Sequence, residues 1–167
     1  MKKPAKSIPP SPQPSGGPPL LVAPNGHPLP IAYRWLRAHG LAALRPWYFI
    51  DDPGQAQRLR GEFALEVAPP NETAVRDLAP FAQRLDRDDV AGFSLREGVL
   101  TGEVCLVTLT WRGRPEQKGW PTLLCYKDFW AFAKDALLED ARDWANEEAL
   151  ARLLPPQKTR LLPPQKK

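Results

Sequence analysis

"RLDRDDVAGFSL" (Arg84–Leu95) places three aspartates within four residues and then continues directly into an apolar segment. These aspartates are Asp86, Asp88 and Asp89. Carboxylates this close repel one another, so a favourable interaction with another group is expected to offset the repulsion. After them every second residue is apolar (Ala91, Phe93 and Leu95), which is the period of a strand with one buried face. The stretch therefore predicts a polar turn that leads into a core strand.

The aspartate group leaves several interpretations open. A calcium loop would need more oxygen ligands at alternating positions, a glycine in mid-loop and a late glutamate, and "DRDDVAGFSLRE" does not have that pattern. A metal-dependent hydrolase that uses Asp86, Asp88 and Asp89 would need further carboxylates from elsewhere in the chain. The alternatives are a solvated turn in which one aspartate binds the turn backbone, and a charged surface that recognises a basic partner.

Further strands are predicted on both sides of this stretch. "EVCLVTLTW" (Glu103–Trp111) is rich in β-branched residues and is the clearest strand in the chain. Residues 96–102, which include two glycines, predict a turn region before it, and residues 120–126 predict another strand after a polar loop. Upstream, the aromatic segment "RPWYFI" (Arg45–Ile50) also predicts a strand.

Two helices are predicted before the aspartates. A short amphipathic helix ends at Gly40 and has apolar residues at positions 31, 32, 35 and 36. The other begins with Asp52 as its cap and Pro53 in its first turn, and Gln55 stands where a capping box requires it. The apolar face of this second helix consists of Ala56, Leu59, Phe63, Ala64 and Val67.

The strongest helical pattern follows Asp128, which is a second predicted cap. Its apolar side begins at Phe129 and Phe132 and continues to Trp144, and the helix can extend to Leu153, where two prolines end it. The order of helices, then strands, then a helix predicts an α+β fold. In this fold an antiparallel sheet packs against helices in a single domain.

The two ends of the chain differ in composition from the middle. Fourteen of the 21 prolines lie in residues 1–30 and 155–164, whereas all 15 aromatic residues lie between Tyr33 and Trp144. A proline-rich segment without aromatic residues cannot bury enough apolar surface to offset the entropy lost on ordering. The sequence therefore predicts three parts: a disordered Pro-rich arm at 1–28, a folded domain at 29–152, and a short tail at 153–167 that carries "LLPPQK" twice.

The net charge of +4 does not describe the folded part. Seven of the 23 basic residues lie in the two end segments, while all 19 acidic residues lie between Asp51 and Glu148, so residues 29–152 carry 16 basic and 19 acidic residues. A mildly acidic body with basic ends does not form the basic groove of a nucleic-acid-binding domain. Binding to nucleic acid is therefore not expected.

Residues typical of catalysis are scarce in the predicted domain. It contains one histidine (His39), one serine (Ser94) and two cysteines (Cys105 and Cys125), too few for a catalytic triad or a zinc site. No glycine-rich phosphate loop precedes a helix. We therefore expect no enzymatic activity and no cofactor, with both cysteines as buried free thiols in a cytoplasmic protein. No signal peptide and no membrane span are predicted.

Four segments occur in an order that resembles the SUKH superfamily (Smi/Knr type): "LRPWYFIDD", "LAPFAQRLDRDDVAGFSL", "GEVCLVTLTW" and "CYKDFWAFAKDALLEDARDW". Together they span residues 44–144. The resemblance implies an α+β binding domain without catalytic residues. Many bacterial members of this superfamily are immunity proteins that bind and neutralise a polymorphic toxin. Gly92 stands where the resemblance leads us to expect a larger residue.

These observations predict a protein that binds a protein partner, with a cognate toxin as the leading candidate. The predicted contact residues are Asp86, Asp88, Asp89, Trp111 and Trp120. The two tryptophans are included because tryptophan is enriched where binding energy concentrates, although both could instead pack at the edge of the core. Two other hypotheses remain open: the metal-dependent hydrolase, and a regulatory scaffold that recruits partners through the Pro-rich arm.

Overall fold

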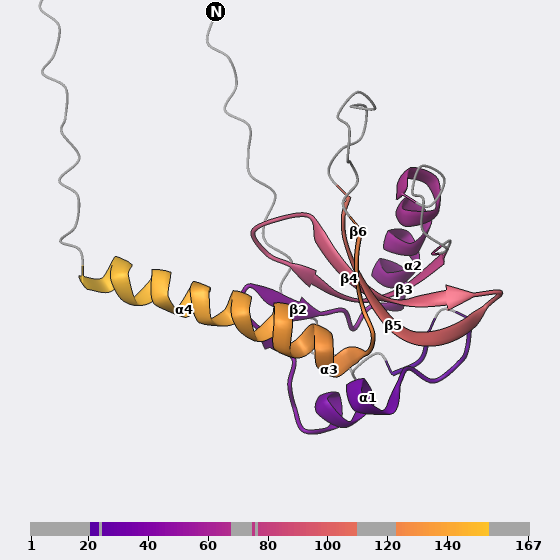
Figure 1. The fold of residues 1–167 in the computed structure, drawn as a ribbon, viewed down its shortest axis with the longest axis horizontal. Coiled ribbons are helices and arrows are strands. Elements are labelled where there is room, and N and C mark those ends of the chain that lie inside the picture. Colours follow the sequence, from indigo (N-terminus) through magenta and orange to yellow (C-terminus); the bar gives the residue numbers. More distant parts are fainter. Residues whose placement is uncertain (1–20, 24, 68–74, 76, 110–122, 154–167) are drawn as a thin grey trace, which may run out of the picture.

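In the computed structural model, the described residues form a six-stranded antiparallel sheet with helices on both faces (Figure 1). The structure describes residues 21–23, 25–67, 75, 77–109 and 123–153. The strands lie side by side in chain order from β1 to β6, and each neighbouring pair is antiparallel. The predicted α+β fold with an antiparallel sheet is confirmed.

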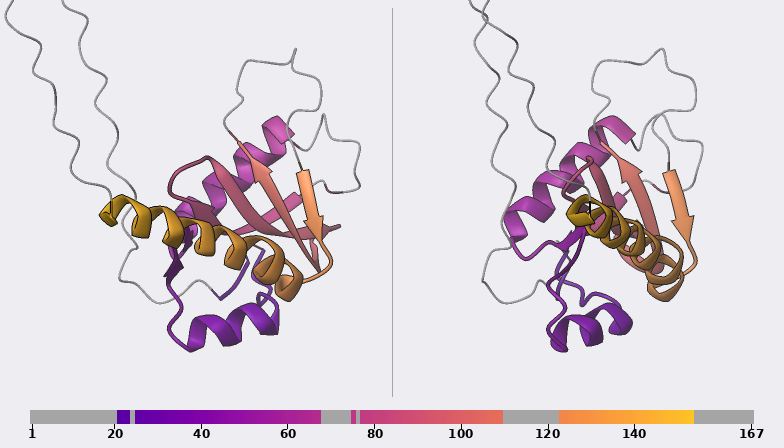
Figure 2. Two further views of the ribbon diagram at one scale, coloured as in Figure 1. Left: turned by 60° about the vertical axis from the view of Figure 1, so that its left-hand side comes forward. Right: turned by 90° about the vertical axis from the view of Figure 1, so that its left-hand side faces the viewer.

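The longest strands lie in the middle of the sheet. The strands are β1 Ala43–Leu44, β2 Trp47–Phe49, β3 Asp77–Arg84, β4 Asp89–Arg96, β5 Val99–Thr108 and β6 Leu123–Tyr126. The helices are α1 Ile31–Ala38, α2 Pro53–Glu62, α3 Phe129–Phe132 and α4 Leu138–Leu153. One π-helical turn, η1 (Phe63–Val67), extends α2, and a second, η2 (Ala133–Leu137), joins α3 to α4. Figure 2 shows α1 and the α3–α4 segment on one side of the sheet and α2 on the other.

Strand β4 is buried on both faces because each face packs against its own helices. Ala91, Phe93 and Leu95 join the larger hydrophobic cluster, on the side of α1 and α3, as the period of two predicts. Val90 belongs to a second cluster beneath α2. The alternating apolar pattern of β4 identifies one buried face correctly. It does not predict burial of the opposite face, which packs beneath α2.

Aromatic rings connect the sheet to the helices in the larger cluster. The ring centroid of Phe81 on β3 lies 4.6 Å from that of Phe93 and 5.1 Å from that of Tyr33 on α1. It lies 5.8 Å from the centroid of Phe129 on α3. Such ring pairs add to the apolar burial and fix the orientation of both helices on the sheet.

Strand β3 is not among the strands predicted from the sequence. Pro80 lies in its middle, and within sheets proline is normally confined to edge strands and bulges. A shift in register between Pro80 and Ala82 admits the proline, and Gly92 of β4 lies opposite it. A Cβ atom on Gly92 would lie 2.5 Å from Cγ of Leu78 and 3.0 Å from the carbonyl oxygen of Ala79. Packing of β3 therefore requires glycine at position 92, and the expectation of a larger residue is wrong.

The predicted turn region at 96–102 is shorter in the structure. Glu97 and Gly98 form a two-residue hairpin turn in which both residues have positive φ, 51° and 78°, as a tight turn between twisted strands requires. Strand β5 then begins at Val99 rather than at Glu103. Trp111 and Trp120, with the loop between them, lie outside the described residues.

Helix α1 turns only part of its predicted apolar face to the core, where Ala32 and Leu36 pack against the larger cluster. Tyr33 and Arg37 are buried, whereas Ile31 and Trp35 are 70% and 53% exposed. Arg37 tolerates burial because its guanidinium forms an ion pair with the buried Asp51. A charged residue thus occupies a core position, which a pattern of apolar residues alone does not reveal.

Both predicted helix caps are confirmed. The carboxylate of Asp52 accepts from the amides of Gly54 and Gln55, and that of Asp128 accepts from the amide of Ala131. The predicted capping box is wrong, since the side chain of Gln55 donates to Tyr48 Oη on β2 instead.

The predicted apolar face of the second helix is right in its first part. Ala56, Leu59 and Phe63 are buried, whereas Ala64 is exposed and the side chain of Val67 lies outside the described residues. The face is therefore shorter than its apolar pattern indicates.

Part of the predicted N-terminal arm packs on the domain. Val22 and Pro28 form an isolated bridge, and Ala23 is buried in the larger cluster. The side chain of Asn25 donates to the carbonyl of Gly98 at the hairpin turn. Packing begins upstream of residue 29, while residues 1–20 and 154–167 lie outside the described residues.

Replacing Gly92 with alanine should lower the free energy of unfolding by about 1–3 kcal/mol, because the new methyl group overpacks the contact with Leu78. Gly61→Ala is the matched control, since nothing lies within 4 Å of a Cβ atom placed there on α2. This control should stabilise the protein by up to about 1 kcal/mol through helix propensity. Urea unfolding of both variants makes the comparison. Equal stability of the Gly92 variant and the native chain would contradict the packing described for β3.

Candidate functional site

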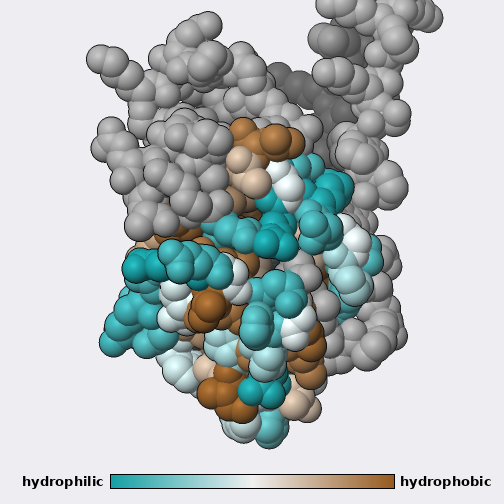
Figure 3. Space-filling view, turned by 90° about the vertical axis from the view of Figure 1, so that its right-hand side faces the viewer, coloured by the Kyte–Doolittle hydropathy of each residue, from teal (hydrophilic) through white to brown (hydrophobic). Residues whose placement is uncertain are grey.

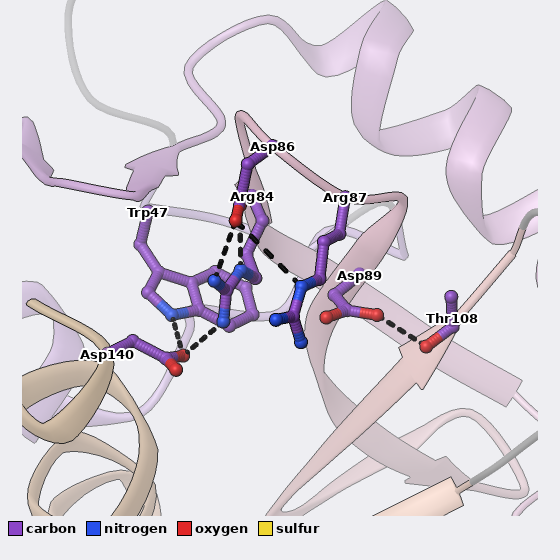
Figure 4. A network of polar contacts seen from close by, with 7 residues as sticks. All are labelled: Trp47, Arg84, Asp86, Arg87, Asp89, Thr108 and Asp140. Carbon is purple, nitrogen blue, oxygen red and sulfur yellow. Dashed lines mark hydrogen bonds and ion pairs between the residues drawn. The ribbon is translucent and has the colours of Figure 1, made fainter. Parts of the chain in front are cut away.

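One buried arginine organises the turn between β3 and β4. The side chain of Arg84 is 9% exposed, and its guanidinium donates to both carboxylate oxygens of Asp86 at 2.9 Å. Its Nη1 lies 2.8 Å from Oδ2 of Asp140 on α4, and its Cζ lies 5.8 Å from the centroid of the Trp47 ring. Trp47 Nε1 donates to the same Asp140 oxygen at 2.7 Å (Figure 4). These four residues are called the Arg84 cluster.

The sheet register and the helix junction bring the Arg84 cluster together. Trp47 and Arg84 are register partners on β2 and β3, so their side chains lie side by side. Asp86 follows in the turn, and Asp140 stands in the first turn of α4. A two-point contact between a guanidinium and a carboxylate is stronger than a single hydrogen bond and fixes the orientation of both groups. The hydrogen bond from Arg84 lowers the pKa of Asp86, although partial burial opposes this shift.

The three predicted site aspartates have three different environments. Asp86 faces Arg84, and Asp89 accepts a hydrogen bond from the hydroxyl of Thr108, its register partner on β5 (Figure 4). Asp88 is exposed, and its carboxylate has no hydrogen bond or ion pair with any other described residue. Asp88 is thus the one aspartate of the three whose side chain has no partner among the described residues. The other two help to build the turn.

This arrangement does not favour a shared metal ion. The carboxylates of Asp86 and Asp89 turn toward different partners. Within the described ranges, no group of three or more His, Cys, Asp or Glu side chains is placed to hold a metal ion. The geometry therefore gives the hydrolase hypothesis no support.

An open hollow of about 620 Å³ lies beside the Arg84 cluster, on the α3–α4 side of the sheet. Its walls come from the β3–β4 turn, strands β5 and β6, and the segment from η2 to the start of α4. Its charged lining consists of Asp88, Asp89, Asp135, Asp140, Arg84 and Arg87. Its apolar lining consists of Leu106, Leu124, Tyr126 and Ala136, and Thr108 completes it. This surface is called the acidic hollow.

The charge of the acidic hollow is negative on balance. Four carboxylates face two guanidinium groups, and Arg84 is already engaged by Asp86 and Asp140. Arg87 is 66% exposed and lies 3.9 Å from Asp86, a distance at which an exposed pair contributes little. The carboxylates least engaged within the fold are that of Asp88 and that of Asp135, which is 54% exposed and has only the exposed Lys134 at 3.6 Å. Negative charge beside an apolar floor suits a cation carried on an alkyl chain.

Two exposed tryptophans form a second surface. Trp35 on α1 and Trp130 on α3 are 53% and 52% exposed, and their ring centroids lie 6.4 Å apart. His39 stacks near Trp35, at 4.2 Å between centroids. This pair is called the Trp face. The sequence does not predict it, because Trp35 belongs to the apolar face that was expected to pack on the core.

The rest of the described surface has fewer features of a binding site. A smaller hollow of about 410 Å³ lies beside α2, where Tyr48, Gln55 and Gln83 hydrogen-bond to one another. The side of the molecule in Figure 3 is mostly hydrophilic, with apolar side chains in small separate groups. Such scattered groups are normal for a protein surface. Of the surfaces described above, the acidic hollow combines charged side chains, apolar side chains and a wall held by hydrogen bonds.

No family model matches the sequence, and no match was found among the curated proteins or the solved structures. None of the helices in the described part of the chain combines the length and the apolar character needed to cross a membrane.

Replacing Asp86 with asparagine should reduce stability at neutral pH and have little effect at acidic pH. Because the folded-state pKa of Asp86 is lowered, the ionised carboxylate stabilises the fold above its unfolded pKa of about 4. This contribution disappears as the pH falls through the folded-state pKa. We expect a loss of about 1 kcal/mol at pH 7, measured by urea unfolding across the pH range.

Asp88→Asn is the control for this prediction, because Asp88 lies two residues away and is exposed. Its effect at pH 7 should stay within about 0.5 kcal/mol. If both variants lost the same free energy of unfolding, the contact with Arg84 would not stabilise Asp86 more than the exposed Asp88 is stabilised. That result would contradict the roles described for the two aspartates.

Proposed function

We propose that the protein is a non-enzymatic binding protein that neutralises a protein toxin by direct contact, as an immunity protein does. The observation that carries this proposal is the acidic hollow, whose lining combines the free carboxylate of Asp88 and the exposed one of Asp135 with Leu106 and Leu124. A lysine or arginine of the partner can pack its alkyl stem on the two leucines while its charged head meets the carboxylates.

The rigidity of the walls favours recognition by this surface. The Arg84 cluster fixes the β3–β4 turn, and the hydrogen bond between Asp89 and Thr108 fixes the start of β4. Because these side chains are already ordered, a partner does not have to supply the free energy for ordering them. Asp88 is then held at the rim with its carboxylate free to bind.

The chemistry of the hollow indicates a basic partner surface. Residues 29–152 carry 19 acidic and 16 basic residues, so the body as a whole also attracts a basic partner. Complementary charge raises the rate of association and selects against wrong partners. A toxin that acts on nucleic acid has a basic cleft, and occupation of that cleft would block it. The resemblance of four ordered segments to the SUKH superfamily supports the same proposal.

A charge-reversal experiment tests the proposal. Asp88→Lys combined with Asp135→Lys reverses the rim while leaving the Arg84 cluster and Asp89 intact. The partner is isolated from the native host with the unchanged protein as bait, identified, and titrated calorimetrically against both forms. The double variant should bind at least about tenfold more weakly, equivalent to about 1.4 kcal/mol, and should fail to protect cells that express the partner.

Asp143→Lys with Glu147→Lys is the matched control, since it changes the net charge equally at two exposed residues of α4 that do not line the hollow. This control should bind and protect as the unchanged protein does. A second comparison uses Trp35→Ala with Trp130→Ala. If the Trp-face variant loses binding while the hollow variant keeps it, the contact lies on α1 and α3 and the proposal for the hollow is wrong.

A further inference from the structure

Two cysteines that the proposed binding site does not use lie directly opposite each other in the sheet. Cys105 on β5 and Cys125 on β6 are register partners, and their Sγ atoms are 3.0 Å apart as free thiols. The sequence predicted two buried thiols. The structure corrects this, because Cys105 is buried whereas Cys125 is exposed.

The geometry of the pair is close to that of a disulfide. Opposite residues of an antiparallel pair have Cα atoms about 4.5–5.5 Å apart, inside the range of about 4.4–6.8 Å that disulfides accept. The two sulfur atoms have to approach by only about 1 Å to reach the bond length of about 2.05 Å. Rotation of the two side chains provides this approach while the paired strands keep their backbone hydrogen bonds.

We propose that Cys105 and Cys125 form a thiol modification site, in which a small disulfide of the glutathione class reacts at Cys125 and Cys105 completes a cross-strand disulfide. The reactant reaches Cys125 because this residue is exposed and because β6 is the last strand of the described sheet. Cys105, beside it on β5, is buried and so shielded from the reactant, but its Sγ contacts that of Cys125. The difference in exposure thus assigns Cys125 to the attack on the reactant and Cys105 to the second step, which releases glutathione.

The electrostatics of Cys105 agree with this order of steps. Burial raises the pKa of the Cys105 thiol, and the hydrogen bond with Cys125 acts in the same direction. Since the thiolate is the reactive form, Cys105 does not start the reaction. Its role begins when a mixed disulfide on Cys125 places an electrophilic sulfur beside it.

The chemistry balances in two exchange steps. The thiolate of Cys125 attacks one sulfur of glutathione disulfide, which breaks that S–S bond and releases one glutathione thiolate. Cys105 then attacks Sγ of Cys125, which breaks the mixed disulfide, and the proton of Cys105 passes to the second glutathione as it leaves. Two protein thiols are oxidised to one disulfide, and one glutathione disulfide is reduced to two glutathione molecules.

The new bond would tie the edge strand to the sheet. Leu124 and Tyr126 flank Cys125 on β6 and turn to the opposite face, where they line the acidic hollow. Oxidation would therefore fix one wall of that hollow. This consequence rests on the proposed function, whereas the exchange chemistry does not.

The test uses the full chain and no partner, so its outcome is independent of the proposed function. The folded, reduced protein is incubated with glutathione disulfide, and the remaining thiols are alkylated and counted by intact mass spectrometry. The native chain should end as a monomer that has lost two hydrogens, with no glutathione attached and no alkylated thiol. Dithiothreitol should restore both thiols.

Two variants separate the roles of the cysteines. Cys105→Ala should stop at a stable glutathione adduct on Cys125, because no resolving thiol remains. Cys125→Ser should stay unmodified while folded, because the remaining thiol is buried. The proposal is overturned if the native chain keeps glutathione on Cys125 beside a free Cys105, forms disulfide-linked dimers, or does not react.

Discussion

The guanidinium of Arg84 joins the parts of the chain that surround the acidic hollow. It is almost completely buried and has Asp86 of the β3–β4 turn, Asp140 of α4 and the Trp47 ring of β2 as partners. A buried cation is costly unless its hydrogen bonds and its charge are matched, and these three partners provide that match. Removing one of these partners would leave the buried guanidinium less well matched, which costs free energy of folding. The β3–β4 turn and α4 therefore hold their positions through the side chain of Arg84.

The contacts of the Arg84 cluster also separate structural from recognition residues. Asp86 and Asp89 have partners within the fold, whereas Asp88 between them points its carboxylate to solvent. The repulsion expected from three close aspartates is relieved because Arg84 and Thr108 bind two of them on different sides. A turn built in this way presents one free carboxylate at a fixed place, which suits a surface for a basic partner better than a site for a shared ion.

Local chemistry explains what could be predicted from the sequence. Asp52 and Asp128 cap helices because a carboxylate near free amides is favourable in any context, and β4 shows its period in Ala91, Phe93 and Leu95. Strand β3, with Pro80 in its middle, was not predicted, and the need for Gly92 arises only when Leu78 packs across the strand pair. Likewise the aspartate group and the neighbouring Arg84 were visible in one stretch, but Thr108, Asp135 and Asp140 come from distant segments that no local pattern connects.

A double-mutant cycle between Arg84 and Asp140 tests the central claim most directly, because it measures the coupling between the β3–β4 turn and α4. Urea unfolding of Arg84→Met, Asp140→Asn and the combined variant gives the interaction energy of the pair. The structure predicts a favourable coupling of about 1.5–3 kcal/mol, as expected for a largely buried, charged hydrogen bond. A coupling within about 0.5 kcal/mol of zero would mean that the two changes are independent, and would contradict the role of Arg84 as the residue that holds the hollow together.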